Sequence, residues 1–164
     1  MAETMIVIVG GGICGLGIGW RLAQAGRKVT VIDRGEAAKA ATWAAAGMLA
    51  PQAEAEHGEE ALLPLALESC EMWPEFAAEL HYETNIDPDY RRHGTLVVSS
   101  DRDDMEYLQN RLNYLKDLGL NIEWLSGYEA RQQEPYLSCN VSGAIWSPDD
   151  HQVDNRCVGI ALKK

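Results

Sequence analysis

Residues 6–33 read IVIVGGGICGLGIGWRLAQAGRKVTVID. An apolar run leads into a glycine-rich turn, a helical pattern extends from Ile13 to Ala25, and Gly26 supplies a C-terminal stop. A second apolar run then ends at Asp33. This order of strand, turn, helix and strand predicts the first βαβ unit of a Rossmann-like α/β domain.

The glycine turn has the spacing of a dinucleotide-binding site. Gly10, Gly12 and Gly15 form G-x-G-x-x-G: the first permits the tight turn, the second lets the backbone approach a pyrophosphate, and the third lets helix pack closely on strand. The pyrophosphate would lie at the helix N-terminus, where free N–H groups and the dipole favour anions. Asp33 predicts hydrogen bonds to a ribose with a free 2′-hydroxyl. The alternative is a glycine-rich turn without a ligand, against which the flanking strand and helix argue.

Composition and charge exclude several classes of partner. The chain has 164 residues and a formal net charge of −11, so it would repel nucleic acids and anionic lipid surfaces. It contains no apolar stretch of membrane-spanning length and no leader pattern at its N-terminus, so we expect a cytoplasmic protein that binds neither membrane nor nucleic acid.

Cysteine and histidine usage predicts no metal site. The four cysteines lie far apart without C-x-x-C spacing, and the four histidines are scattered, so we expect reduced thiols and no zinc centre.

Beyond Asp33 the sequence departs from a simple repeat of the first unit. Residues 36–50 are almost all small, Pro51 ends this run, and an apolar stripe at helical spacing predicts a helix over 59–83 that Pro64 and Pro74 break into pieces. Five further elements are expected: a strand over 92–99, a helix over 101–118, a strand over 121–125, a helix from the Ser126/Glu129 capping box to Pro135, and a strand over 141–146.

The last expected element is a helix that begins at Asn155 after an Asp154 N-cap and has no C-terminal stop signal. Either another chain covers this helix, or it is a terminal helix that frays at its end. We expect four successive segments: 1–50 for the N-terminal part of the nucleotide domain, 51–90 for helices packed on it, 91–147 for part of a second domain, and 148–164 for a return to the first.

Three segments together resemble a known family. The glycine turn, TWAAAGMLAP at residues 42–51, and DDHQVD at residues 149–154 resemble the flavin-dependent D-amino acid oxidase superfamily, most closely the glycine oxidases of thiamine biosynthesis. The resemblance implies a Rossmann-like FAD-binding domain with part of an α+β substrate domain, incomplete in this chain. It also implies FAD as cofactor, and oxidation of glycine or another small amino acid or amine to an imine while O₂ is reduced to H₂O₂.

The resemblance also assigns candidate residues. The pyrophosphate of FAD would contact Gly10, Gly12, Ile13, Cys14 and Gly15; the adenosine ribose would contact Asp33 and Arg34; the diphosphate would again be approached at Thr42 and Trp43; and the isoalloxazine ring would lie beside Ala46, Gly47 and Met48, with Met48 facing substrate. Trp43 departs from the small residue expected there, which limits close approach to its backbone. An ordinary core methionine is the alternative for Met48. No residue of this chain is expected to act as a catalytic acid or base.

Members of this superfamily are much longer chains, and their substrate-binding arginine lies in the part that has no counterpart here. We therefore expect a second polypeptide, or the remaining half of the same gene product, and an oligomeric assembly. The expected open edge of the nucleotide-binding sheet points the same way. Two alternatives stay open: a flavin-dependent dehydrogenase of D-amino acids or secondary amines, and a non-catalytic FAD-binding subunit.

Overall fold

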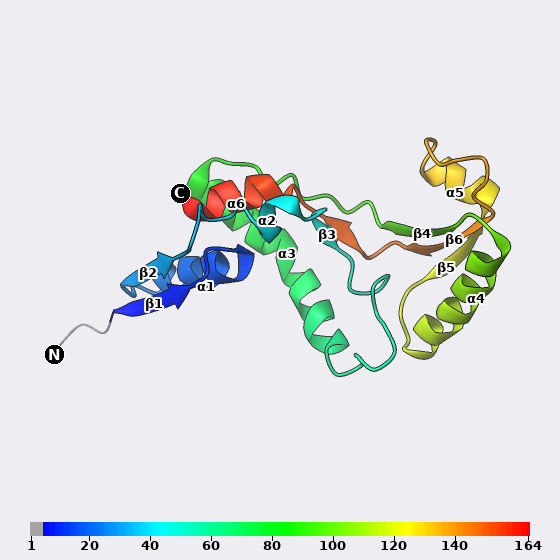
Figure 1. Ribbon diagram of the computed structural model, residues 1–164, viewed down its shortest axis with the longest axis horizontal. Helices are drawn as coiled ribbons and strands as arrows, with labels where there is room; N and C mark the ends of the chain where they lie inside the picture. The colour runs from blue at the N-terminus through cyan, green and yellow to red at the C-terminus, as the bar shows by residue number, and fades with distance from the viewer. Residues whose placement is uncertain (1–4) are drawn as a thin grey trace. The chain divides into compact units, whose positions relative to one another are not determined.

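The computed structural model describes residues 5–164, apart from the side chain of Arg102. The chain forms two compact units that interleave along the sequence (Figure 1). The first unit contains the residues up to 47, 74–90 and 153–164, and the second contains 48–73 and 91–152. Each unit is therefore assembled from pieces that are distant in sequence, and residues 48–73 belong to the second unit.

The first unit begins with the expected βαβ motif. Strand β1 (Ile6–Val9) pairs in parallel with β2 (Val29–Ile32), with Ile6 opposite Val29, and helix α1 (Ile13–Gln24) connects them. Helix α1 ends at an Ala25 cap followed by Gly26 with φ of 71°. The strand, helix and stop signals read from residues 6–33 are confirmed.

The two faces of this small sheet have different surroundings. Helix α1 runs along the β1–β2 ribbon in Figure 1 and approaches it closely at Gly19, where a Cβ would lie 3.3 Å from Val31. The side chains of the opposite face are exposed, with 48% of Val7 and 83% of Val9 accessible. Alternation along each strand directs one set of side chains to α1 and leaves the other set uncovered.

The remaining regular elements of the first unit are helices. It contains the one-turn helix α2 (Ala41–Ala44), the second half of α3 (Leu63–Thr84), and α6 (Asn155–Lys163). The Asp154 side chain accepts from the amides of Arg156 and Cys157, which confirms the expected N-cap of α6. Trp20 of α1 meets Phe76 of α3 edge to face at a ring distance of 5.1 Å, and its indole donates to Glu83.

Helix α3 corrects one expectation. It starts at Leu63 rather than near 59 and continues without interruption to Thr84, so neither proline breaks it. Pro64 lies in the first turn, where a backbone N–H has no intrahelical acceptor in any case. Pro74 lies inside the helix and does not end it.

The second unit is built on a three-stranded antiparallel sheet in the order β4-β6-β5. Its elements are β4 (Thr95–Ser99), α4 (Arg102–Asp117), β5 (Glu123–Ser126), α5 (Gly127–Gln133) and β6 (Gly143–Ser147). Ile145 of β6 packs with Leu108, Leu112 and Leu115 of α4, whereas the adjacent Ala144 packs with Ala130 of α5. Because successive side chains of a strand face opposite sides, the two helices cover opposite faces of this sheet. The Ser126/Glu129 capping box is confirmed at the start of α5.

A second, two-stranded sheet in this unit pairs β3 (Met48–Leu49) with β7 (His151–Gln152). The buried carboxylate of Asp150 accepts hydrogen bonds from the amides of Gln52 at 3.0 Å and Ala53 at 2.8 Å. Asp150 therefore holds the segment that follows β3 against the turn before β7.

Within residues 5–164, no helix is both long enough and apolar enough to cross a membrane. No group of histidine, cysteine and acidic side chains in that range could hold a metal ion. All four cysteines are free thiols.

Candidate functional site

The glycine turn at the start of α1 is shaped by two glycines that the fold itself requires. Gly10 has φ of 111°, a conformation that side chains disfavour. A Cβ on Gly15 would lie 1.9 Å from the carbonyl oxygen of Gly10, so only glycine lets α1 start this close to the end of β1. These are the first and third glycines of the motif, and their predicted structural roles agree with this geometry.

Gly12, the middle glycine, is different because no contact within residues 5–164 requires a glycine there. It is the N-cap of α1, with φ of −82° and ψ of −175°, which any residue can adopt. A Cβ at this position would meet only the hydroxyl oxygen of Thr42, at an ordinary 3.5 Å. The exposed space over Gly12 is therefore kept open toward solvent, as close approach of a pyrophosphate requires.

Hydrogen-bond donors surround this space. The amide of Ile13 donates to Thr42 Oγ1 at 2.9 Å, and helix geometry leaves the amides of Cys14 and Gly15 without an intrahelical acceptor. The first turn of α1 contains no acidic residue, so the positive end of the helix dipole is not neutralised there. The Thr42 hydroxyl accepts one bond and keeps its own proton for donation. This donor set fits the two phosphates of a dinucleotide.

The segment after β2 is hydrogen-bonded to the glycine turn. Asp33 Oδ2 accepts from the amide of Gly11 at 2.8 Å, the amide of Ala38 donates to the carbonyl of Gly11 at 2.8 Å, and Thr42 holds Ile13. Asp33 Oδ1 accepts from Gly35 at 2.8 Å. The bonds of Asp33 and Ala38 to Gly11, together with the bond between Thr42 and Ile13, hold the glycine turn at three points.

Asp33 is thus a turn-holding residue as well as the candidate ribose ligand. The amide of Gly11, followed by that of Gly35, lowers the pKa of the Asp33 carboxyl below its usual value. An ionised carboxylate has about four lone-pair directions, so two bonds to the backbone leave acceptor capacity for ribose hydroxyls. The neighbouring Arg34 is exposed.

Trp43 directs its ring toward cations. The Lys39 ammonium lies 3.3 Å from the ring centroid and the Arg156 guanidinium carbon lies 5.1 Å from it. The Trp43 carbonyl accepts from the side chains of Asn155 and Arg156. The large side chain that departs from the expected small residue is accommodated by these two cations.

The last three candidates, residues 46–48, are consecutive in the sequence, where the chain passes from the first unit to the second. Ala46 is exposed, and Gly47 has φ of 79° with its Cβ position 2.0 Å from the carbonyl oxygen of Val153. Gly47 is therefore required by packing against Val153. Met48 begins the second unit on β3, and 46% of its side chain is exposed.

Two residues that sequence reasoning missed support the site. The Asn155 side chain donates to the carbonyls of Thr42 and Trp43, and Gly159 packs against Ala38 and Thr42. Asn155 lies 113 residues from Thr42, so no local pattern could have paired them.

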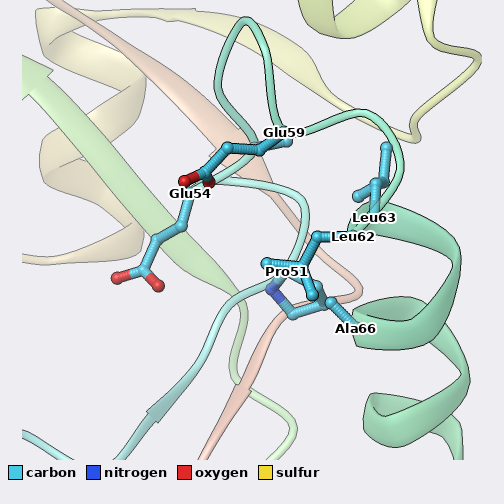
Figure 2. A pocket seen from close by; sticks show the side chains of 7 residues that line it. Pro51, Glu54, Glu59, Leu62, Leu63 and Ala66 are labelled. Carbon is cyan, nitrogen blue, oxygen red and sulfur yellow. The ribbon is translucent and has the colours of Figure 1, made fainter.

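The second unit has a small hollow after β3 that does not suit a flavin. Its volume is about 170 Å³, and it is lined by Pro51, Glu54, Ala55, Glu59, Leu62, Leu63 and Ala66. In Figure 2, Pro51, Leu62 and Ala66 lie close together, and the Glu54 carboxylate extends away from them. Among these lining residues are two acids and no cation, so the hollow would repel a carboxylate ligand.

A second hollow of about 320 Å³ lies between α4 and the 55–57 segment, and it does contain a cation, Arg111. The Arg111 guanidinium donates to the carbonyl of Ala53 at 2.6 Å and to the hydroxyl of Tyr107 at 3.1 Å, and lies 3.7 Å from Glu56. These contacts tie α4 to the segment that precedes α3.

Comparison with known proteins agrees with the geometry of the glycine turn. The glycine oxidase of Geobacillus kaustophilus is 33% identical over 158 residues, which cover 96% of this chain and 42% of the relative. Its crystal structure superposes with a TM-score of 0.89. The bifunctional protein ThiO/ThiG of Trichormus variabilis is 36% identical over 96% of this chain and 23% of its own length.

A solved iminodiacetate oxidase from Chelativorans sp. BNC1 is 27% identical with a TM-score of 0.76, over 96% of this chain and 42% of its own. The chain thus spans less than half the length of each of these relatives. Residues 5–164 match the family described as FAD dependent oxidoreductase. The donors at the glycine turn fit a pyrophosphate, and the family match covers nearly the whole sequence: the chain belongs to the FAD dependent oxidoreductase family, whose cofactor is FAD.

Proposed function

We propose that this chain is the FAD-binding portion of an oxidase that acts on glycine or another small amino acid or amine. The observation that carries the proposal is the difference between the glycines of the turn. Gly10 and Gly15 are required by the fold, whereas Gly12 leaves open a donor-lined space that the chain does not fill. The substrate class is supported by the glycine oxidases among the relatives.

In this proposal the FAD pyrophosphate lies over Gly12 and accepts from the amides of the first turn of α1 and from the Thr42 hydroxyl. Asp33 and Arg34 hold the adenosine ribose, and residues 46–48 lie beside the isoalloxazine ring. Small side chains at Ala46 and Gly47 let backbone N–H groups approach the ring, and Met48 offers an exposed thioether to substrate. Bound FAD supplies the two-electron oxidation of the amine carbon that no protein side chain can perform.

The chain's own contribution is to bind and orient the cofactor. We assign none of its residues as a catalytic acid or base. We propose that the substrate-binding arginine and the rest of the substrate pocket come from the remaining portion of a longer protein or from a second polypeptide. In the proposed reaction, O₂ accepts the electrons and leaves as H₂O₂, and the amine leaves as an imine. An oligomeric assembly is part of the same proposal.

The first test is cofactor retention and turnover. Purified protein should be yellow with a flavin spectrum, and with the remaining portion of the enzyme present, adding glycine should consume O₂ and release H₂O₂ in equal amounts. A colourless protein that takes up no FAD on titration would contradict the proposal. Bound FAD without turnover on any amine, even with the remaining portion of the protein present, would support a non-catalytic subunit instead.

A second candidate is a flavin-dependent enzyme for secondary amines, as oxidase or dehydrogenase. It is favoured by the likeness to iminodiacetate oxidase. Comparing kcat/KM for glycine, sarcosine, D-alanine and iminodiacetate separates the substrate classes. Stopped-flow reoxidation of reduced protein by O₂ separates oxidase from dehydrogenase, because a dehydrogenase would react slowly with O₂ and readily with another acceptor.

A further inference from the structure

The segment that places Thr42 over the glycine turn cannot hold its own conformation. Helix α2 contains only residues 41–44, and a single helical turn is unstable alone because nucleation is costly. Ala38, just before it, is 6% exposed and has φ of 61°, a left-handed conformation that is unfavourable for alanine. Something outside the segment must stabilise both features.

The contacts of α6 supply that support. The Asn155 side-chain amide donates to the carbonyls of Thr42 and Trp43, which lie at the end of α2 where carbonyls lack intrahelical partners. One side-chain amide therefore fixes two successive peptide groups, the ones that follow Thr42 and Trp43. The effect passes on to the glycine turn because Thr42 Oγ1 accepts from Ile13.

Gly159, one turn further along α6, sets how closely the helix approaches. A Cβ at this position would lie 2.9 Å from the Cβ of Ala38 and 3.4 Å from the methyl group of Thr42. Glycine is helix-destabilising, and here it permits a contact distance that alanine would not. Helix α6 thus packs closely against Ala38, whose backbone is strained, and against the Thr42 side chain.

We infer that Asn155 and Gly159 are positioning residues for cofactor binding: they hold Thr42 over the pyrophosphate position from an element that contributes no residue to the glycine motif. The inference rests on the proposed FAD site. Neither residue contacts the space over Gly12 itself, so each acts through Thr42.

The experiment is a double-mutant cycle on FAD affinity, measured by flavin fluorescence in the purified protein with apoprotein melting temperatures alongside. Asn155→Leu keeps the branching and number of side-chain heavy atoms and removes the donors, and should weaken FAD binding about three- to ten-fold, the range for one hydrogen bond. Asn155→Gln, which keeps the amide, should recover part of the affinity. In a Thr42→Val background, Asn155→Leu should have little further effect, because the route through Thr42 is already cut.

Asn113→Leu, on an exposed position of α4, is the matched control and should leave FAD affinity unchanged. If Asn155→Leu does not fold, Gly159→Ala tests the same inference. It should weaken FAD binding, and the loss should be smaller in the Thr42→Val background than in the native one. An Asn155→Leu effect of equal size in both backgrounds, or none in either, would overturn the inference.

If Gly12→Ala binds FAD like the native protein, the proposed site and the inference both fail. If Gly12→Ala loses FAD while Asn155→Leu does not, only the inference fails.

Discussion

Replacing Gly12 by alanine should weaken cofactor binding while leaving the stability of the fold nearly unchanged. The added methyl group would meet only Thr42 Oγ1, at 3.5 Å, and the backbone angles at Gly12 are open to alanine. Alanine is a poorer N-cap than glycine by up to about 1 kcal/mol, but it also restricts the unfolded chain, which stabilises by about 0.4–1 kcal/mol. These two effects offset each other, so the free energy of unfolding of the apoprotein should change by less than about 1 kcal/mol.

The same methyl group should weaken FAD binding at least about ten-fold, or about 1.4 kcal/mol, because it occupies the space into which the pyrophosphate must come. Gly15→Ala is the contrasting variant. Its methyl group would lie 1.9 Å from the Gly10 carbonyl oxygen, so α1 would have to move away from the turn. Overpacking of this kind costs about 1–3 kcal/mol or more, against about 1 kcal/mol gained in helix propensity.

The assay combines FAD titration by fluorescence with thermal unfolding of the apoproteins. Gly12→Ala should lose affinity at an unchanged melting temperature, whereas Gly15→Ala should melt earlier, by about 2–4 °C for each kcal/mol lost. Native-like FAD affinity in Gly12→Ala would refute the assignment of the turn to the pyrophosphate. A drop in melting temperature as large as that of Gly15→Ala would refute the argument that the fold does not need Gly12.

Three further changes test other parts of the structure. Asp33→Asn should weaken FAD binding about ten-fold. It should also reduce, without abolishing, the loss of stability that the native protein shows as pH falls below the usual carboxyl range, because Asp33 is one of several carboxyls whose pKa is lowered in the folded state. Burial, followed by the Arg92 guanidinium, lowers the pKa of His151, and two neighbouring aspartates oppose this more weakly. The native protein should therefore lose stability as pH falls from 7 through about 6.5. His151→Gln should flatten that part of a series of denaturation measurements. Met48→Ala should shift the flavin absorption bands and the substrate KM while the apoprotein melts as before, since nearly half of that side chain is exposed; a lower melting temperature with an unchanged spectrum would assign Met48 to packing instead.

The features that the sequence predicted correctly are those that local patterns encode. The βαβ unit of residues 6–33 follows from alternating apolar runs, a 3.6-residue period and glycine stops, all within about 30 residues. The Ser126/Glu129 capping box and the Asp154 N-cap span three residues each. The breaks expected at Pro64 and Pro74 were wrong, because a proline in the first turn loses no hydrogen bond and the helix tolerates the second.

Only the tertiary structure showed which glycines the fold requires and which one it leaves free for the proposed site. Gly10, Gly12 and Gly15 look alike in the sequence, but Gly15 lies against a carbonyl oxygen and Gly12 faces solvent. The bond between Asp33 and the Gly11 amide, and the support of Thr42 by Asn155, join residues 22 and 113 positions apart. Periodicity and capping report the neighbours of a residue along the chain, whereas these contacts depend on where the folded backbone brings distant segments together.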